Sequence, residues 1–264
     1  MSETPSIEPK VSNATLTAAL QARGFKQLHQ IIHLFAGGSH QHGARLPGKA
    51  DLDVCGIYVP NADKTLGIDI EEHFVSSTGV KHEKNTSEDT DFALYSLRRW
   101  AYLAAKGNPT VLSYLFMPPG ESGVWREMIV PYRDIFLASA HTQAFLGYAG
   151  NQLKRLQGKL GAGKHGQRDD IQGYDTKAAM HMIRMMHECL ELLTTGKMTF
   201  PRPEVDLLME IRTGGWGQAR VESYFFALQD EVRARELDSV LPRDIDRGKI
   251  SNLIAQAYLR HWER

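Results

Sequence analysis

Apolar and polar positions follow different rhythms in the two halves of the chain. Over residues 1–120, apolar side chains come in short runs that stop at turn signals, which is typical of buried strands separated by loops. These runs predict strands at 31–36, 52–59, 71–77 and 92–94. From residue 121 onward, apolar side chains recur with a helical period. The pattern therefore indicates a small sheet in the first half and a set of helices in the second.

Glycine, proline and capping residues mark where the helices are expected to begin and end. In the first half, helices are predicted at 14–23 and 95–106, with a short one from Pro109 to about residue 116. In the second half, they are predicted at 142–156, 176–195, 204–211, 221–235 and 249–264. Asn108-Pro109 is interpreted as the cap of a helix rather than as a ligand. The sequence thus predicts an α+β protein with a sheet domain at 1–120 and a helical domain at 121–264.

Composition narrows the function classes only modestly. The 264 residues include 31 basic and 31 acidic side chains, so the formal net charge is zero, which excludes a strongly basic coat protein and an acidic disordered chain. Cys55 and Cys189 are far apart in sequence, which excludes a disulfide framework and a cysteine-based zinc site. The chain has neither an apolar run of membrane-spanning length nor a signal-like N-terminus. We expect a cytoplasmic protein with no membrane partner.

The strongest chemical signal is a pair of carboxylates at the start of the second predicted strand. Asp51 and Asp53 are two residues apart, so their side chains point to the same face of a strand. Two carboxylates held this close repel each other unless a cation lies between them, and hard oxygen ligands suit Mg²⁺. The alternative is a solvated pair at a strand edge. A third carboxylate on a neighbouring strand would complete a two-metal site, and Asp91 is placed for it, although Asp69 and Asp89 compete on spacing alone.

Two other features are suited to binding phosphate. The Gly38-Ser39 turn after the first strand offers backbone N–H groups and a hydroxyl, because glycine lets a ligand approach the backbone closely. On the predicted helix 176–195, Lys177, His181 and Arg184 fall on one face and form a cationic stripe. The alternative is that this stripe is only a solvated helix face. Gln152 and Arg155, beside Tyr148, form a similar but weaker face. The methionines at 180, 182, 185 and 186 are expected to pack in the core.

These motifs resemble a known superfamily. Gly38-Ser39-x3-Gly43 followed by Asp51-Leu52-Asp53 is similar to the signature of the DNA polymerase β-like nucleotidyltransferases. The segments at 95–97, 106–110, 174–184 and 192–196 resemble one branch of it, the predicted nucleotidyltransferases associated with RNA repair (RlaP-type), which also occur in phages. The resemblance extends over roughly residues 31–215. Two departures stand out, because His40-Gln41-His42 replaces the usual Arg-Ala-Tyr and Ala50 replaces a frequent serine.

The resemblance implies a polymerase β-like palm followed by a helical domain. It implies that Asp51, Asp53 and Asp91 hold Mg²⁺ or Mn²⁺, and that Gly38, Ser39, Lys177, His181 and Arg184 bind the nucleotide. The expected reaction moves a nucleoside monophosphate from an NTP such as ATP to an RNA acceptor and releases pyrophosphate, as in RNA repair. Transfer to a protein or a small molecule, and a non-catalytic palm that binds nucleic acid, are the alternatives. The oligomeric state is left without a prediction.

Overall fold

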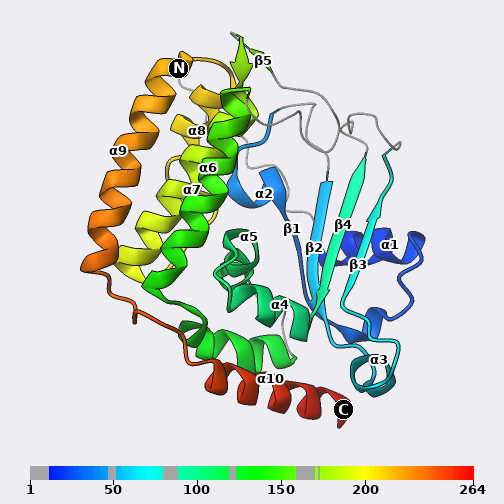
Figure 1. The fold of residues 1–264 in the computed structure, drawn as a ribbon. Coiled ribbons are helices and arrows are strands. Elements are labelled where there is room, and N and C mark those ends of the chain that lie inside the picture. Colours follow the sequence, from blue (N-terminus) through cyan, green and yellow to red (C-terminus); the bar gives the residue numbers. More distant parts are fainter. Residues whose placement is uncertain (1–11, 47–51, 80–88, 119–122, 159–169, 172) are drawn as a thin grey trace, which may run out of the picture.

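The computed structural model describes residues 12–46, 52–79, 89–118, 123–158, 170–171 and 173–264. Figure 1 shows a four-stranded sheet on one side of the molecule and a group of helices on the other. The fold is mixed α and β, with a small mixed sheet and many helices, consistent with a polymerase β-like palm. The predicted fold class is therefore confirmed.

The sheet contains all four predicted strands. They are β1 (Ile31–Ala36), β2 (Leu52–Tyr58), β3 (His73–Ser77) and β4 (Thr90–Ser96), in the spatial order β1-β2-β4-β3. β2 and β4 are parallel, whereas the two outer pairs are antiparallel. Parallel neighbours need a crossover connection, and here it runs through a short helix, α3 (Ala62–Leu66), and β3. This order makes β2 and β4 the two central strands.

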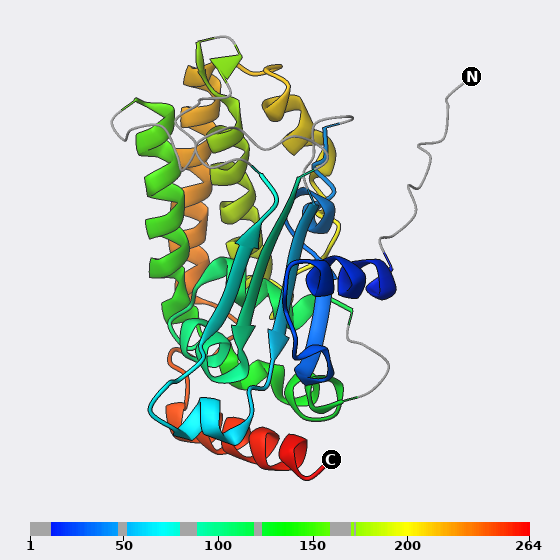
Figure 2. The ribbon, with the colours of Figure 1, turned by 90° about the vertical axis from the view of Figure 1, so that its right-hand side faces the viewer.

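Each face of the sheet is covered by different helices. Side chains alternate along a strand, so Val54 and Cys55 on β2 point to opposite faces. Val54, Phe92 and Leu94 pack with Leu16 and Leu20 of α1 (Asn13–Ala22). The opposite face joins the larger hydrophobic cluster, which includes residues of the long helices. Figure 2 shows the sheet between α1 and these helices.

The long helices agree closely with the sequence prediction. α6 (Thr142–Leu156) and α7 (Thr176–Thr195) have the predicted bounds, because local caps and glycines mark their ends. The remaining helices are α4 (Leu97–Ala104), α5 (Pro109–Leu112), α8 (Val205–Arg212), α9 (Gln218–Leu237) and α10 (Arg247–Trp262). Asn108 caps α5 as predicted, since its Oδ1 accepts a hydrogen bond from the Val111 N–H over 3.1 Å.

Several predicted boundaries differ from the structure by two or three residues, and the start of α4 is the one that changes the sheet. The helix expected to begin at Tyr95 begins at Leu97, because β4 continues through Ser96. The Ser96 hydroxyl then caps α4 by accepting a hydrogen bond from the Arg99 N–H. Pairing along the whole length of β2 keeps Tyr95 and Ser96 in the sheet. The local sequence pattern does not show that Tyr95 and Ser96 are in a strand, because their pairing partners on β2 are far away in the chain.

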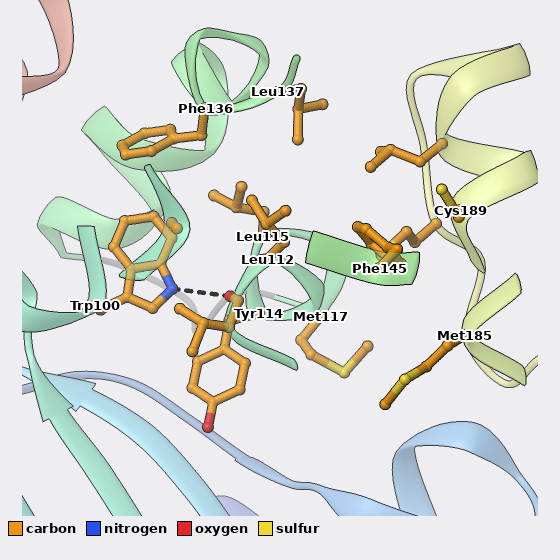
Figure 3. Packing of buried hydrophobic residues seen from close by; sticks show 14 of the residues in the cluster. Trp100, Leu112, Tyr114, Leu115, Met117, Phe136, Leu137, Phe145, Met185 and Cys189 are labelled. Atoms are coloured by element: carbon orange, nitrogen blue, oxygen red, sulfur yellow. Dashed lines mark hydrogen bonds between the residues drawn. The ribbon is translucent and has the colours of Figure 1, made fainter. Parts of the chain in front are cut away.

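The larger hydrophobic cluster holds residues from both halves of the chain. Figure 3 shows Trp100 and Phe136 at one side of this cluster and Phe145 and Met185 at the other. The Trp100 indole N–H donates to the Val111 carbonyl oxygen over 3.0 Å. The four methionines of α7 are buried here, as predicted. At the base, the Trp262 indole N–H of α10 donates to the Pro60 carbonyl oxygen over 3.0 Å. The division into domains at 1–120 and 121–264 stays a prediction. Among the helices that the structure describes, none has the length and apolarity that crossing a membrane requires.

We expect the fold to lose stability in mild acid because it buries neutral histidines. His33 is 2% exposed and its ring stacks on Trp125 with centroids 4.6 Å apart. Burial lowers the pKa of His33 to about 3, whereas an unfolded histidine titrates near about 6.5. Protonation therefore favours the unfolded chain, and stability is lost as the pH falls below about 6.5. His33 alone accounts for about 2 kcal/mol between pH 7.5 and 5.

The measurement is the free energy of unfolding in urea as a function of pH. His33→Leu should flatten the loss between pH 7.5 and 5, whatever its effect on absolute stability. His73→Leu is the matched control, because it makes the same substitution at an exposed position on β3. A His33→Leu curve parallel to that of the wild type would contradict the assignment.

Candidate active site

Asp53 and Asp91 lie side by side on the sheet. They are direct partners in the parallel pairing of β2 and β4, so their side chains leave the same face. Both residues are half-buried. This is the face of Cys55 and Ile57, which is turned toward the larger hydrophobic cluster. Neighbouring strands are about 4.8 Å apart, so the two carboxylates are close enough to share a cation.

A short helix packs directly against Asp53. The helix α2 (Gly38–His42) follows β1, and the Gly37 N–H donates to the Asp53 carbonyl oxygen over 2.8 Å. Gly38 has φ +55°, and a Cβ built on it would collide with the Asp53 carboxylate oxygen and lie 2.8 Å from its Cγ. Only glycine satisfies both conditions. The predicted phosphate turn, Gly38 and Ser39, is therefore in contact with the predicted metal ligand.

The structure also separates Asp91 from its competitors. The Asp89 carboxylate accepts a hydrogen bond from the Thr78 hydroxyl over 3.1 Å. Asp69 is exposed and precedes β3, whose first residue pairs with Tyr95 at the far end of β4. Asp91 is therefore the candidate beside Asp53. Asp51 lies outside the described residues, and within the described part no group of three His, Cys, Asp or Glu residues could hold a metal ion.

Cys55 follows Asp53 on the same face of β2 and contacts Tyr114. Burial raises the pKa of Cys55 to about 12, and its thiol hydrogen-bonds with the Tyr114 hydroxyl. Burial likewise holds the pKa of Tyr114 well above its usual value. Both groups stay protonated at neutral pH, so Cys55 is not a thiolate nucleophile. Sequence reasoning did not identify Tyr114, which follows α5 and reaches the sheet only through tertiary packing.

The other end of α2 is held by a buried network from α7. Arg184 Nη1 donates to Glu188 Oε1 over 2.9 Å and also hydrogen-bonds with the ring of His42, the last residue of α2. His42 Nδ1 lies 3.3 Å from Glu188 Oε1. The Arg202 N–H donates to the His42 carbonyl oxygen over 3.1 Å. Figure 1 shows α2 between the sheet and α7, so this network connects the two parts of the molecule.

Burial and neighbouring charges together set the protonation states of the groups in this network. Burial, and then the neighbouring Arg184 charge, hold the pKa of His42 well below its usual value, so the ring is neutral. Burial raises the pKa of Glu188, and Arg184 opposes that shift. Arg184 is 8% exposed. Its guanidinium is thus engaged in positioning α2, and its predicted role as a nucleotide ligand stays a prediction.

The rest of the predicted cationic stripe lies nearer the surface. Lys177 is exposed in the first turn of α7, and His181 is half-buried one turn further on. Burial, followed by the charges of Arg184, Lys177, Arg212 and Arg155, holds the pKa of His181 well below its usual value. Arg155 belongs to the weaker face noted in the sequence. Sequence reasoning missed Arg212, since nothing in the sequence pairs the end of α8 with the start of α7.

An apolar groove of about 500 Å³ lies elsewhere, between α4 and α10. Arg98, Tyr102, Ile254 and Tyr258 are among its lining residues. α4 follows the last residue of β4, so the groove is at the opposite end of that strand from Asp91. It holds none of the predicted site residues and is not part of the candidate site.

A mixed four-stranded sheet with adjacent carboxylates on parallel strands, and a glycine-led helix packed against Asp53, defines a polymerase β-like palm. Residues 13–239 match the model of the RNA repair pathway DNA polymerase beta family, and the chain belongs to that family. It is therefore a nucleotidyltransferase-like protein.

Two individual proteins are similar to parts or most of the chain. An uncharacterized 38.9 kDa protein from the nrdC-mobD intergenic region of Enterobacteria phage T4 is 33% identical over 124 residues, which span 45% of this chain and 36% of the phage protein. The crystal structure of a nucleotidyltransferase-like protein from Exiguobacterium sibiricum 255-15 covers 94% of this chain and 78% of its own, with 10% identity and a TM-score of 0.31. The second likeness is too remote to support an inference.

Replacing Gly38 tests the contact between α2 and β2. Gly38→Ala should destabilise the protein by at least about 1–2 kcal/mol, because alanine resists a left-handed backbone and its methyl group would displace Asp53. Gly150→Ala is the matched control. Its site in α6 is open, so alanine should be neutral or stabilising by up to about 1 kcal/mol. Urea unfolding measures both, and equal stability of Gly38→Ala and wild type would refute the contact.

Proposed function

We propose that the protein transfers a nucleoside monophosphate from an NTP to an RNA acceptor and releases pyrophosphate. The observation that carries this proposal is the pairing of Asp53 with Asp91 under a helix that begins at Gly38. Carboxylates can hold the cation of a metal-bound polyphosphate, and a glycine-led turn can donate backbone N–H groups to its phosphate oxygens. Membership of the RNA repair pathway DNA polymerase beta family supports the reaction class and the choice of RNA.

The donor set fits a divalent cation. Asp53 and Asp91 leave one face of the sheet, and like charges this close are unfavourable without a cation. Together with Asp51, they would hold Mg²⁺ or Mn²⁺. Such ions, when bound, neutralise charge on the attacking oxygen and on the departing pyrophosphate. The half-buried setting of both carboxylates would strengthen this interaction.

The chain's own residues then bind and orient the substrates. The Gly38 backbone and the Ser39 hydroxyl are suited to donate to the triphosphate, with Lys177 and His181 on the facing helix as further phosphate contacts. The acceptor hydroxyl oxygen forms a bond to the α-phosphorus while the bond between the α- and β-phosphates breaks. The hydroxyl proton leaves to solvent, and the electron pair departs with pyrophosphate. His42 and Arg184 hold α2 in place during this step.

Transfer to a protein or a small molecule, and a non-catalytic palm that binds nucleic acid, are the competing functions. The zero net charge gives no general attraction to polynucleotides, so an RNA acceptor requires a local basic surface. Cys55 and Cys189 form no disulfide, which agrees with a reducing cytoplasm as the site of action.

The test incubates the protein with each labelled NTP, Mg²⁺ or Mn²⁺, and separate pools of RNA, DNA and protein. We expect label to enter RNA, with one pyrophosphate released per transfer. Asp53→Asn and Asp91→Asn should each lower the rate at least about a hundredfold, because loss of a metal ligand removes several kcal/mol of transition-state stabilisation. Asp69→Asn is the matched control, since Asp69 is exposed and precedes β3, whose first residue pairs with the end of β4 remote from Asp91.

Near-normal turnover in both ligand variants would contradict the proposed mechanism. Label entering only protein or a small molecule would replace the acceptor while leaving the reaction class intact. RNA binding without any transfer by the wild type would favour the non-catalytic palm.

A further inference from the structure

Cationic side chains from three helices gather at one end of the helical layer. Lys177 precedes His181 by one turn on α7, so both lie on the same face. Arg155 belongs to the last turn of α6, the helix that packs alongside α7. Arg212 is the last residue of α8, and its Nη1 donates to the Thr176 hydroxyl oxygen over 3.3 Å. Because Thr176 begins α7, this hydrogen bond places Arg212 beside Lys177.

The same cationic groups surround His181. The pKa of His181 is lowered by burial first and then by Arg184, Lys177, Arg212 and Arg155, so the ring is neutral among four cations. The Arg184 charge is paired with Glu188. Within the described part of the chain, Lys177 and Arg155 form no ion pair with a carboxylate. Lys177 and Arg155 therefore carry charges that can attract an anion, while the Asp175 carboxylate at this end is engaged in capping α7.

The backbone at this end of α7 is partly satisfied already. The Asp175 side chain accepts a hydrogen bond from the Ala178 N–H over 2.9 Å and caps the helix. An anion would therefore be bound by side chains rather than by the helix terminus itself. Arginine guanidinium groups suit this role, because their planar fork matches two phosphate oxygens at once.

We propose that Arg155, Lys177 and Arg212 form a clamp for the triphosphate of the NTP. This proposal rests on the proposed function, which brings a triphosphate to the face of the sheet that is turned toward α7. Lys177 and Arg184 are seven residues apart, or about 10 Å along the helix, and Arg184 contacts His42 at the end of α2. One helix, α7, therefore carries both Lys177 of the clamp and the Arg184 contact that positions α2.

The experiment measures binding of inorganic tripolyphosphate by calorimetry, without metal, so that it does not depend on turnover. Arg155→Gln, Lys177→Gln and Arg212→Gln should each weaken binding about tenfold, the usual effect of losing one charge-assisted hydrogen bond. Arg212→Lys is a milder variant that keeps the charge at the half-buried position. Lys154→Gln is the matched control, because Lys154 is exposed, adjoins Arg155 on α6 and is not among the groups that act on His181.

A second readout is the NMR titration of the His181 ring. Bound tripolyphosphate should raise the His181 pKa, since a nearby anion stabilises the imidazolium form. Unchanged affinity in all three glutamine variants, or an unmoved His181 titration at saturating tripolyphosphate, would overturn the clamp. If a 5′-phosphorylated oligoribonucleotide binds through the same three residues and tripolyphosphate does not, the site belongs to the acceptor and the triphosphate assignment is wrong.

The two proposals fail in distinguishable ways. Tripolyphosphate binding that depends on the three residues, in a protein that transfers no nucleotide, would sustain the clamp and refute the transfer reaction. Nucleotide transfer that persists with the normal KM for NTP in all three glutamine variants would sustain the reaction and refute the clamp. Asp53→Asn should retain metal-free tripolyphosphate binding, because Asp53 contributes to the metal site and not to the clamp.

Discussion

The contact between α2 and β2 is the constraint on which the candidate site depends. A helix of five residues is too short to be stable on its own, so its position has to be imposed from outside. At its start, the absence of a side chain at Gly38 lets the backbone approach the Asp53 carboxylate. At its end, His42 is fixed by Arg184 of α7 and by the Arg202 backbone. The phosphate turn is thereby held between the sheet and the helical layer.

Charge is divided between the two sides of this junction. The sheet contributes carboxylates, Asp53 and Asp91, whereas the helices contribute cations. Between them lies a buried ion pair, Arg184 with Glu188, flanked by the neutral ring of His42. Buried ion pairs add little net stability because desolvation offsets the attraction, so the function of this pair is better understood as fixing geometry. A substrate with both a metal-binding end and an anionic tail matches this division.

The C-terminal helix shows how far the fold extends beyond the family match. The match ends at residue 239, but α10 continues the larger hydrophobic cluster through Ile250, Ile254 and Tyr258. The Tyr258 hydroxyl accepts a hydrogen bond from the Arg98 N–H over 3.2 Å, at the start of α4. α4 follows β4 directly, so α10 braces the end of a central strand. Support for the sheet therefore comes from a segment outside the residues that match the family.

The sequence by itself determined the strands, the long helices and Asp53 as a candidate ligand. Those features depend on local rules, because side-chain alternation, helical periodicity and capping act within a few residues. Only the tertiary structure placed Asp91, rather than Asp69, beside Asp53, since that depends on the strand order and on the parallel register of β2 with β4. It also buried Arg184 against His42 and brought Arg212 to the start of α7. Such contacts join residues far apart in the chain, and packing of whole elements decides them.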